Sequence, residues 1–403
     1  MSASSSNTQA HRNPPFRAEH LGSLLRPQAL LEARKTKSKD EIADITDKSI
    51  KDAVYMQKEL GFHAMTDGEY RRHMFWGELF PSLKGMTVTK DVNIDMFRTY
   101  VPDIAAFMET NENPDETVIC TSKISHSGTS PFLPELKYIQ SITPQSEHDK
   151  VKLTMPAPEW YHLRYKEGRA YTKDVYVNDE EYFKDIAKAY QAEIKILYDA
   201  GLRNLQIDDP NLAYFCSEKM LQGWKEDSSN SKTSEEMLDA YIALYNDCLS
   251  TRPSDMHVGL HLCRGNFVGS RHFSEGGYDR VAIKLFQSIN VDTYYLEYDT
   301  ERAGSFEPLK HLPRHKNVIL GVITSKFPKL EDREAMKDRI LNAAKCVAEG
   351  SGESEKQALQ RLGVSPQCGF ASHEGGNLLS YDDMKKKLAL VRSIADDLWP
   401  GEP

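Results

Sequence analysis

Apolar residues along the chain follow a helical pattern in some segments and an extended pattern in others. Between residues 183 and 197 they recur every three or four positions, as on the buried face of an amphipathic helix. Asn178 before this stretch and Gly201 after it are residue types that begin and end helices. The clearest helical patterns predict helices at residues 39–60, 178–201, 232–249, 331–349 and 380–398.

Short, mostly apolar segments between these helices predict strands. They cover residues 17–21, 64–69, 152–156, 204–208, 257–263, 293–297, 318–324 and 364–368. Strands that alternate with helices pair in parallel, and eight such units predict a closed (β/α)8 TIM barrel of the α/β class.

The interval from residue 73 to residue 148 is too long for one connection between barrel strands. Another strand-like run at residues 118–125 lies within it, so we expect an inserted hairpin or lid after the second strand. Residues 1–14 are rich in Ser, Thr and Asn, and we expect a disordered tail there. Because no repeat or break in composition follows, we expect a single barrel domain at residues 15–403.

The overall charge narrows the classes of function. Asp and Glu number 60 against 51 for Lys and Arg, a formal net charge of −9 without a dense basic stripe, which argues against nucleic-acid binding. No apolar run approaches the roughly 20 residues that cross a bilayer, so we expect no membrane span. The first ten residues lack the apolar core of a signal peptide, and we therefore expect a cytoplasmic protein.

Six cysteines are widely spaced and contain no CxxC pair, which indicates a reduced protein without a disulfide framework. We expect four of them to pack as small apolar groups, namely Cys120, Cys216, Cys248 and Cys346. The other two, Cys263 and Cys368, end predicted strands and are candidates for chemistry.

Polar and ionisable residues follow almost every predicted strand. In a (β/α)8 barrel these strand ends meet at one mouth, where catalytic residues lie. Loops are polar in any protein, but the same placement after so many strands favours a shared site. The residues concerned are His20, Gly22, Ser23, Asp67, Glu69, Arg71, Arg72, Gln206, Asp208, Asp209, His261, Cys263, Arg264, Asn266, Glu297, Asp299, Thr324, Ser325, Lys326 and Cys368.

His261 and Cys263 form an H-x-C pair whose side chains point to the same side of an extended strand. Such a pair alone is more often a structural histidine beside a core cysteine. Glu297 and Cys368 at the ends of two later strands change this balance, because one nitrogen, two sulfurs and one carboxylate oxygen suit Zn²⁺. Ligands that come from distant strands favour a catalytic zinc over a structural one.

These residues resemble the C-terminal catalytic barrel of cobalamin-independent methionine synthase, and the chain is closest to the short single-barrel proteins of that kind. The resemblance covers residues 16–399. It implies a barrel of the methionine synthase/uroporphyrinogen decarboxylase-like type. A decarboxylase of that type uses no metal, so the four-ligand set counts against that activity. The motifs that carry the resemblance are Asp67-Gly68-Glu69, Ile207-Asp208-Asp209-Pro210, His261-x-Cys263, Tyr295-Leu296-Glu297 and Ser365-Pro366-Gln367-Cys368-Gly369.

The resemblance implies roles for individual residues. The zinc ligands fall on His261, Cys263, Glu297 and Cys368. Glu69 and Asp208 would bind the amine of homocysteine, and the amino-acid carboxylate would lie beside Ser23. Zinc would remove the proton of the substrate thiol, whose ordinary pKa is about 8.5, and so supply a nucleophilic thiolate.

Two departures from the family pattern concern the methyl donor. The full synthase has a second, N-terminal barrel that helps to bind the polyglutamate tail of folate, and we expect none here. A catalytic histidine in a His-Ser-Pro segment is replaced by Ser325-Lys326-Phe327-Pro328. We therefore expect Lys326, with Asp208, among the catalytic residues, and a donor other than polyglutamated folate.

Further candidates keep two interpretations each. Arg72 and Arg264, with Arg71, either bind an anionic group of the second substrate or form ion pairs with the acidic residues at the mouth. Aromatic residues form either a wall for a flat heterocycle or core packing: Phe75, Trp76 and Trp160. His373 and Glu374 are either partners of the zinc ligands or solvent-facing loop residues.

We therefore expect a zinc-dependent methyltransferase similar to 5-methyltetrahydropteroyltriglutamate–homocysteine S-methyltransferase. Its partners would be a homocysteine-like thiol and a methyl or alkyl donor, and a homo-oligomer stays open. One alternative is a zinc enzyme that alkylates another thiol, with an epoxide for example, or that cleaves a C–S bond. Plain folate-dependent methionine synthase and a non-catalytic zinc or ligand-binding barrel are the others.

Overall fold

The computed structural model describes residues 14–90, 92–109 and 116–403. Almost all of the expected disordered tail, residues 1–14, lies outside this range. Within it, six parallel strands form one sheet in chain order. They are β3 (Lys152–Pro156), β4 (Asn204–Asp209), β5 (His257–Leu262), β6 (Thr293–Glu297), β7 (Asn317–Ile323) and β8 (Leu362–Pro366).

Two shorter segments close this sheet into a (β/α)8 barrel. Ala18 makes a parallel bridge to Val364 of β8, and Met65 makes one to Val151 beside β3. The prediction of regular strands at 17–21 and 64–69 is wrong in this respect. Both segments turn away soon after their bridges, because Gly22 and Gly68 adopt left-handed φ angles of 98° and 69°.

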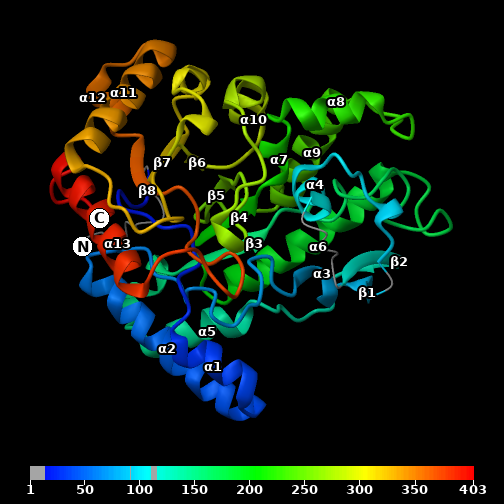
Figure 1. Ribbon diagram of the computed structural model, residues 1–403, viewed down its shortest axis with the longest axis horizontal. Helices are drawn as coiled ribbons and strands as arrows, with labels where there is room; N and C mark the ends of the chain where they lie inside the picture. Colours follow the sequence, from blue (N-terminus) through cyan, green and yellow to red (C-terminus); the bar gives the residue numbers. More distant parts are fainter. Residues whose placement is uncertain (1–13, 91, 110–115) are drawn as a thin grey trace, which may run out of the picture.

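Helices surround the sheet (Figure 1). Those expected from apolar periodicity lie where predicted: α2 (Lys39–Glu59), α6 (Asp179–Asp199), α9 (Ser234–Leu249), α11 (Arg333–Ser351) and α13 (Tyr381–Leu398). Asn178 caps α6 by accepting a hydrogen bond from the Glu181 amide. Additional helices are α1 (Gln28–Thr36), α3 (Leu79–Ser82), α4 (Pro102–Glu109), α5 (Leu133–Ile142), α7 (Asn211–Tyr214), α8 (Glu218–Glu226), α10 (Ala282–Ser288) and α12 (Glu355–Leu359). Among the described helices, none has the length and apolar character needed to span a membrane.

The insertion after the second barrel segment contains an antiparallel hairpin, as expected. It consists of β1 (Lys84–Thr89) and β2 (Thr117–Ser125), and it lies at the side of the barrel near α3 (Figure 1). The Tyr165 hydroxyl donates to the carbonyl of Val118 at 2.9 Å, and the Cys120 amide donates to the carbonyl of Ala170 at 3.0 Å. The loop after β3 therefore fixes the hairpin against the barrel.

The interior of the barrel combines apolar packing with one buried ion pair. Leu21, Tyr295 and Ile319 form a small cluster inside the sheet. A Cβ at Gly259 would lie 2.3 Å from the Tyr295 ring, so only glycine leaves room for this ring. The Lys152 ammonium lies 2.6 Å from the Glu19 carboxylate, with both side chains buried. This filled interior leaves the carboxyl ends of the strands as the place for a site.

Candidate functional site

Register places polar side chains of neighbouring strands at the same height. Asp208 of β4 pairs with His261 of β5, and His261 pairs with Tyr295 of β6. Cys263 and Glu297 lie two residues beyond His261 and Tyr295, so their side chains also face the barrel mouth. Cys368 lies two residues after the end of β8.

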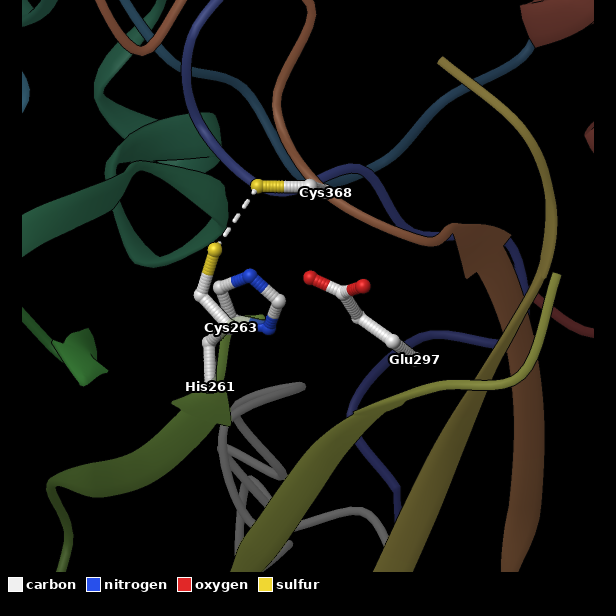
Figure 2. A group of neighbouring side chains, drawn as sticks. All are labelled: His261, Cys263, Glu297 and Cys368. Atoms are coloured by element: carbon white, nitrogen blue, oxygen red, sulfur yellow. Dashed lines mark hydrogen bonds between the residues drawn. The ribbon is translucent and has the colours of Figure 1, made fainter. Parts of the chain in front are cut away.

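Four of these side chains converge on one point. One potential ligand atom from each of His261, Cys263, Glu297 and Cys368 lies within 4.8 Å of those from the others, and all four residues are buried. The two sulfur atoms are 3.4 Å apart. Figure 2 shows the imidazole, the carboxylate and both sulfurs turned toward a common centre.

Hydrogen bonds orient the nitrogen and sulfur atoms of this cluster. Nδ1 of His261 lies 3.1 Å from the carbonyl oxygen of Tyr295 and donates its proton there, so Nε2 is the ring nitrogen that could bind a metal. Among the described residues, this buried Nε2 has no hydrogen-bond partner. The Cys263 sulfur accepts a hydrogen bond from the Gly265 amide at 3.3 Å.

The sulfurs and the carboxylate differ in how readily they carry negative charge. The hydrogen bond between the two thiols lowers the pKa of Cys368 and raises that of Cys263, so one proton serves both. Burial would raise the pKa of Glu297, but Arg302 and Lys326 bring it below its usual value. A buried set of one nitrogen, two sulfurs and one carboxylate, with an orphaned Nε2, fits Zn²⁺ better than Mg²⁺ or Ca²⁺.

Two buried carboxyl groups lie in the same cavity as this cluster. Oε1 of Glu69 accepts a hydrogen bond from the Thr154 hydroxyl at 2.7 Å, whereas Oε2 has no partner among the described residues. Burial raises the pKa of Glu69 to about 8, and the neighbouring Asp208 contributes to this shift. Burial also raises the pKa of Asp208, to about 6. Two carboxyl groups that face one cavity are suited, once deprotonated, to an ammonium group.

Glu69 has a strained backbone that directs its side chain into the cavity. Its φ angle is 61°, in the left-handed region that non-glycine residues seldom adopt. The Asp67 carboxylate accepts a hydrogen bond from the Glu69 amide at 2.8 Å and stabilises this turn. Strain of this kind is typical of functional positions.

The structure places Arg72 behind the cavity wall. Its guanidinium forms two hydrogen bonds with the Glu135 carboxylate, at 3.0 and 2.6 Å, and one with the Thr154 hydroxyl at 2.9 Å. It approaches Glu69 to only 3.8 Å. This arrangement favours the ion-pair interpretation over direct contact with a substrate.

Arg264 and Lys326 are also buried outside the cavity lining. The Arg264 guanidinium packs 4.2 Å from the centre of the Tyr278 ring. Nζ of Lys326 donates to the carbonyls of Gly265 and Arg271, at 2.9 and 3.2 Å, and to the Asn266 side chain at 3.2 Å. Lys326 therefore holds the loop that follows Cys263.

The cavity has a volume of about 140 Å³ and joins the cluster to an aromatic wall. Its wall includes Ser23, Glu69, Asp208, His261, Cys263 and Cys368, together with Phe75, Trp76, Trp160, Phe107, Phe267 and Phe273. The rings of Trp76 and Trp160 lie 4.9 Å apart, and Phe75 packs edge-on against Trp160 at 5.0 Å. The three predicted aromatic residues thus pack together and also line the cavity.

Some relevant residues were not recognised in the sequence. Arg302 and Arg164 reach the site from loops, and no spacing in the sequence marks them. Thr154 lies within a predicted strand, but nothing distinguishes its hydroxyl from that of other threonines. Of the two candidates beyond Cys368, Glu374 pairs with Arg34 and His73, and His373 packs 5.6 Å from the Phe267 ring.

The fold and the cluster define the class of protein. It is a TIM barrel whose mouth holds one histidine, two cysteines and one glutamate arranged as potential metal ligands. The family model described as cobalamin-independent synthase, catalytic domain, matches residues 170–392. The chain is 34% identical over 398 residues to the uncharacterized protein YxjH of Bacillus subtilis, with 97% of each chain covered. It therefore belongs to the family of cobalamin-independent methionine synthase catalytic domains and is a methionine-synthase-like methyltransferase.

Two further comparisons agree with this family. A Listeria monocytogenes protein, provisionally named a vitamin-B12 independent methionine synthase, superposes with a TM-score of 0.69 at 29% identity, covering 95% of this chain and 98% of that one. The 5-methyltetrahydropteroyltriglutamate–homocysteine methyltransferase of Bacillus subtilis is 24% identical over 240 residues. That match covers 59% of this chain and 26% of the longer relative.

Proposed function

We propose that the protein is a zinc-dependent thiol methyltransferase that acts on homocysteine or a closely related amino-acid thiol. The convergence of His261, Cys263, Glu297 and Cys368 within 4.8 Å carries this proposal. Zinc, when bound there, supplies the positive charge that keeps an incoming thiol deprotonated and nucleophilic.

The residues of the chain prepare the site for this reaction. The Tyr295 carbonyl holds the His261 ring so that Nε2 faces the two sulfurs. Glu69 and Asp208 would bind the ammonium group of the thiol substrate, and Ser23 would lie beside its carboxylate. The unpartnered Oε2 of Glu69, buried in the cavity wall, supports this role.

The charge of the cavity lining supports a methyl donor other than polyglutamated folate. Arg164 is the arginine that lines the cavity, and its guanidinium is paired with Asp103 and packs over the Trp160 ring. No lysine is among the lining residues in the described part of the chain, so a polyanionic tail would find no free cation. The donor is therefore expected to present an apolar or flat surface to Phe75 and Trp76.

A cytoplasmic location belongs to the same proposal. All six cysteines are unpaired and buried, as expected for a protein in a reducing compartment. Both proposed substrates are small molecules. This fits a site enclosed within a barrel mouth and needs no nucleic-acid surface.

Purified protein can test the function directly. It should contain about one zinc per chain, and mass spectrometry of homocysteine incubated with different donors should detect S-methylation. Methyl iodide serves as a donor that requires no binding site, so its reaction reports the activated thiol alone. The proposal would be contradicted if the purified protein contained no zinc and did not accelerate the methylation of homocysteine by methyl iodide. Rapid turnover with triglutamated methyltetrahydrofolate, about 1 per second or more, would make it plain methionine synthase. Reaction with an epoxide alone would indicate the alkyltransferase alternative.

A further inference from the structure

Glu297 differs from the other three members of the donor cluster in its surroundings. The Nε2 of His261 is unpartnered within the described chain, and the two sulfurs bond chiefly to each other. Both oxygens of Glu297, by contrast, have strong partners. Oε1 accepts a hydrogen bond from the Arg264 amide at 2.7 Å, and Oε2 accepts one from Nη2 of Arg302 at 3.0 Å.

Arg302 is itself fixed in place and cannot simply follow Glu297. It lies on the turn η6 (Glu301–Ala303). Its Nη1 donates to the Thr300 hydroxyl at 2.8 Å, and its Nη2 lies 2.9 Å from the Asp299 carboxylate. The Arg302 side chain is only 10% exposed. A nearly buried guanidinium with its own acidic partner is thus held beside one member of the metal-type cluster.

We infer that Arg302 is a positioning residue that competes with the metal for Glu297 and so makes this carboxylate the exchangeable ligand. The inference rests on the proposed zinc site. Arg302 offers Glu297 a second partner of opposite charge, which it can keep whenever a substrate sulfur takes its place. The partners of the two sulfurs are instead the other sulfur, the Gly265 amide and the neighbouring His261.

The expected change in zinc affinity distinguishes this role from that of a residue that merely supports a metal ligand, because the two changes have opposite signs. Residues that hold a metal ligand in its binding orientation weaken metal affinity when they are removed, by about 10- to 100-fold. Arg302 bonds to Oε2 of Glu297 and shares the negative charge that a metal would attract, so its removal should increase the affinity. Arg302→Gln should therefore bind zinc about tenfold more tightly than the parent.

Zinc affinity measured by competition with a chromophoric chelator, with no thiol present, tests this expectation. Arg302→Lys keeps the charge but offers one donor atom in place of a guanidinium fork, and its affinity should lie between those of the parent and of Arg302→Gln. Arg280→Gln removes an arginine that pairs with Glu218 near the surface, and it should bind zinc like the parent. Circular dichroism establishes whether each variant is folded. If Arg302→Gln does not fold, the affinity of Arg302→Lys tests the inference in its place.

A double-mutant cycle separates an effect through Glu297 from a general effect of charge. In a Glu297→Gln background, Arg302→Gln should no longer change zinc affinity, because the competing carboxylate is gone. An equal increase in both backgrounds would mean that the guanidinium acts only through its electric field, and this would overturn the inference.

X-ray absorption gives a second readout that does not depend on turnover. In the parent, homocysteine should add one sulfur neighbour to zinc and remove one oxygen neighbour. In Arg302→Gln the oxygen neighbour should remain, and homocysteine should bind about tenfold more weakly. Unchanged or weaker zinc affinity in Arg302→Gln overturns the inference alone. A parent protein that binds no zinc overturns the proposed function.

Discussion

The sulfur atoms of Cys263 and Cys368 lie 3.4 Å apart, although 105 positions separate the two residues. Cys263 follows β5 and Cys368 follows β8, and two further strands stand between them in the sheet. Only closure of the barrel brings these strand ends to one mouth. The contact is therefore a property of the whole fold.

Replacement of either cysteine should remove most of the zinc. Cys263→Ser and Cys368→Ser each lose a thiolate ligand, and plasma mass spectrometry of the purified proteins should show well under half an equivalent of metal. Both variants should stay folded, because the barrel core is formed by other residues. Cys346→Ser, a buried cysteine on α11, should keep its zinc. Full occupancy in the double variant Cys263→Ser, Cys368→Ser would exclude these ligands.

Binding of an amino-acid thiol should strengthen as pH rises toward 8. Glu69 has a pKa of about 8 before the ligand binds, so at lower pH it is largely protonated and cannot pair with an ammonium group. Homocysteine binding should thus release protons near pH 7, which calorimetry in buffers of different ionisation enthalpy measures.

The matched ligand 4-mercaptobutanoate lacks the amine. It should still release its thiol proton when it binds zinc, but not the additional proton of Glu69, so its affinity should rise less steeply with pH. Glu69→Gln should bind homocysteine about tenfold more weakly, and its affinity should vary less with pH. If this variant and the parent bind homocysteine with equal affinity, Glu69 does not bind the ammonium group.

Lys326→Met should loosen the loop after Cys263 without releasing zinc. The substitution removes an ammonium group that bonds to Gly265, Asn266 and Arg271, and it leaves buried acceptors unpaired. We expect a loss of about 3 kcal/mol in unfolding free energy and a lower rate of methyl transfer. Hydrogen exchange should become faster in residues 264–271. A variant with normal exchange there but no activity would indicate instead that the ammonium acts directly in the reaction.

The contribution of His257 to the stability of the protein should fall as pH decreases from 6.5 to 4. His257 is fully buried between Asn204 and Thr293, and burial lowers its pKa to about 4. The unfolded chain binds a proton near pH 6.5 and the folded protein does not, so acid favours unfolding over this interval. The shift corresponds to about 3 kcal/mol.

Urea titrations at several pH values measure this slope, and His257→Gln should reduce it. His315→Gln, at an exposed position, should leave it unchanged. The same slope in His257→Gln and the parent would mean that other groups, such as the buried His20, carry the effect.

The sequence was sufficient to predict the barrel and the grouping of the donor residues. Strand–helix alternation gives the topology, and topology alone brings His261 and Cys368 to the same mouth. Extended geometry explains why His261 and Cys263 face one side. These inferences need only local periodicity and the convergence of parallel strands.

Other features depend on three-dimensional packing and could not be predicted. The segments at 17–21 and 64–69 read as strands, yet glycines with left-handed backbones end them after a single bridge each. Arg72 was expected to bind substrate and Lys326 to act in catalysis, whereas their hydrogen-bond partners, Glu135 and the loop at 265–271, lie elsewhere in the chain. Their assigned roles at the substrate remain predictions.

The long sequence separation of the two cysteines also affects how the protein is made. A ribosome adds about 5–20 residues per second, so roughly 5–20 s pass between the synthesis of Cys263 and that of Cys368. During this interval the nascent chain holds only an incomplete set of donors. The complete set of metal ligands therefore forms late in synthesis. A zinc ion bound by all four ligands would show that the last part of the barrel has been synthesised and folded.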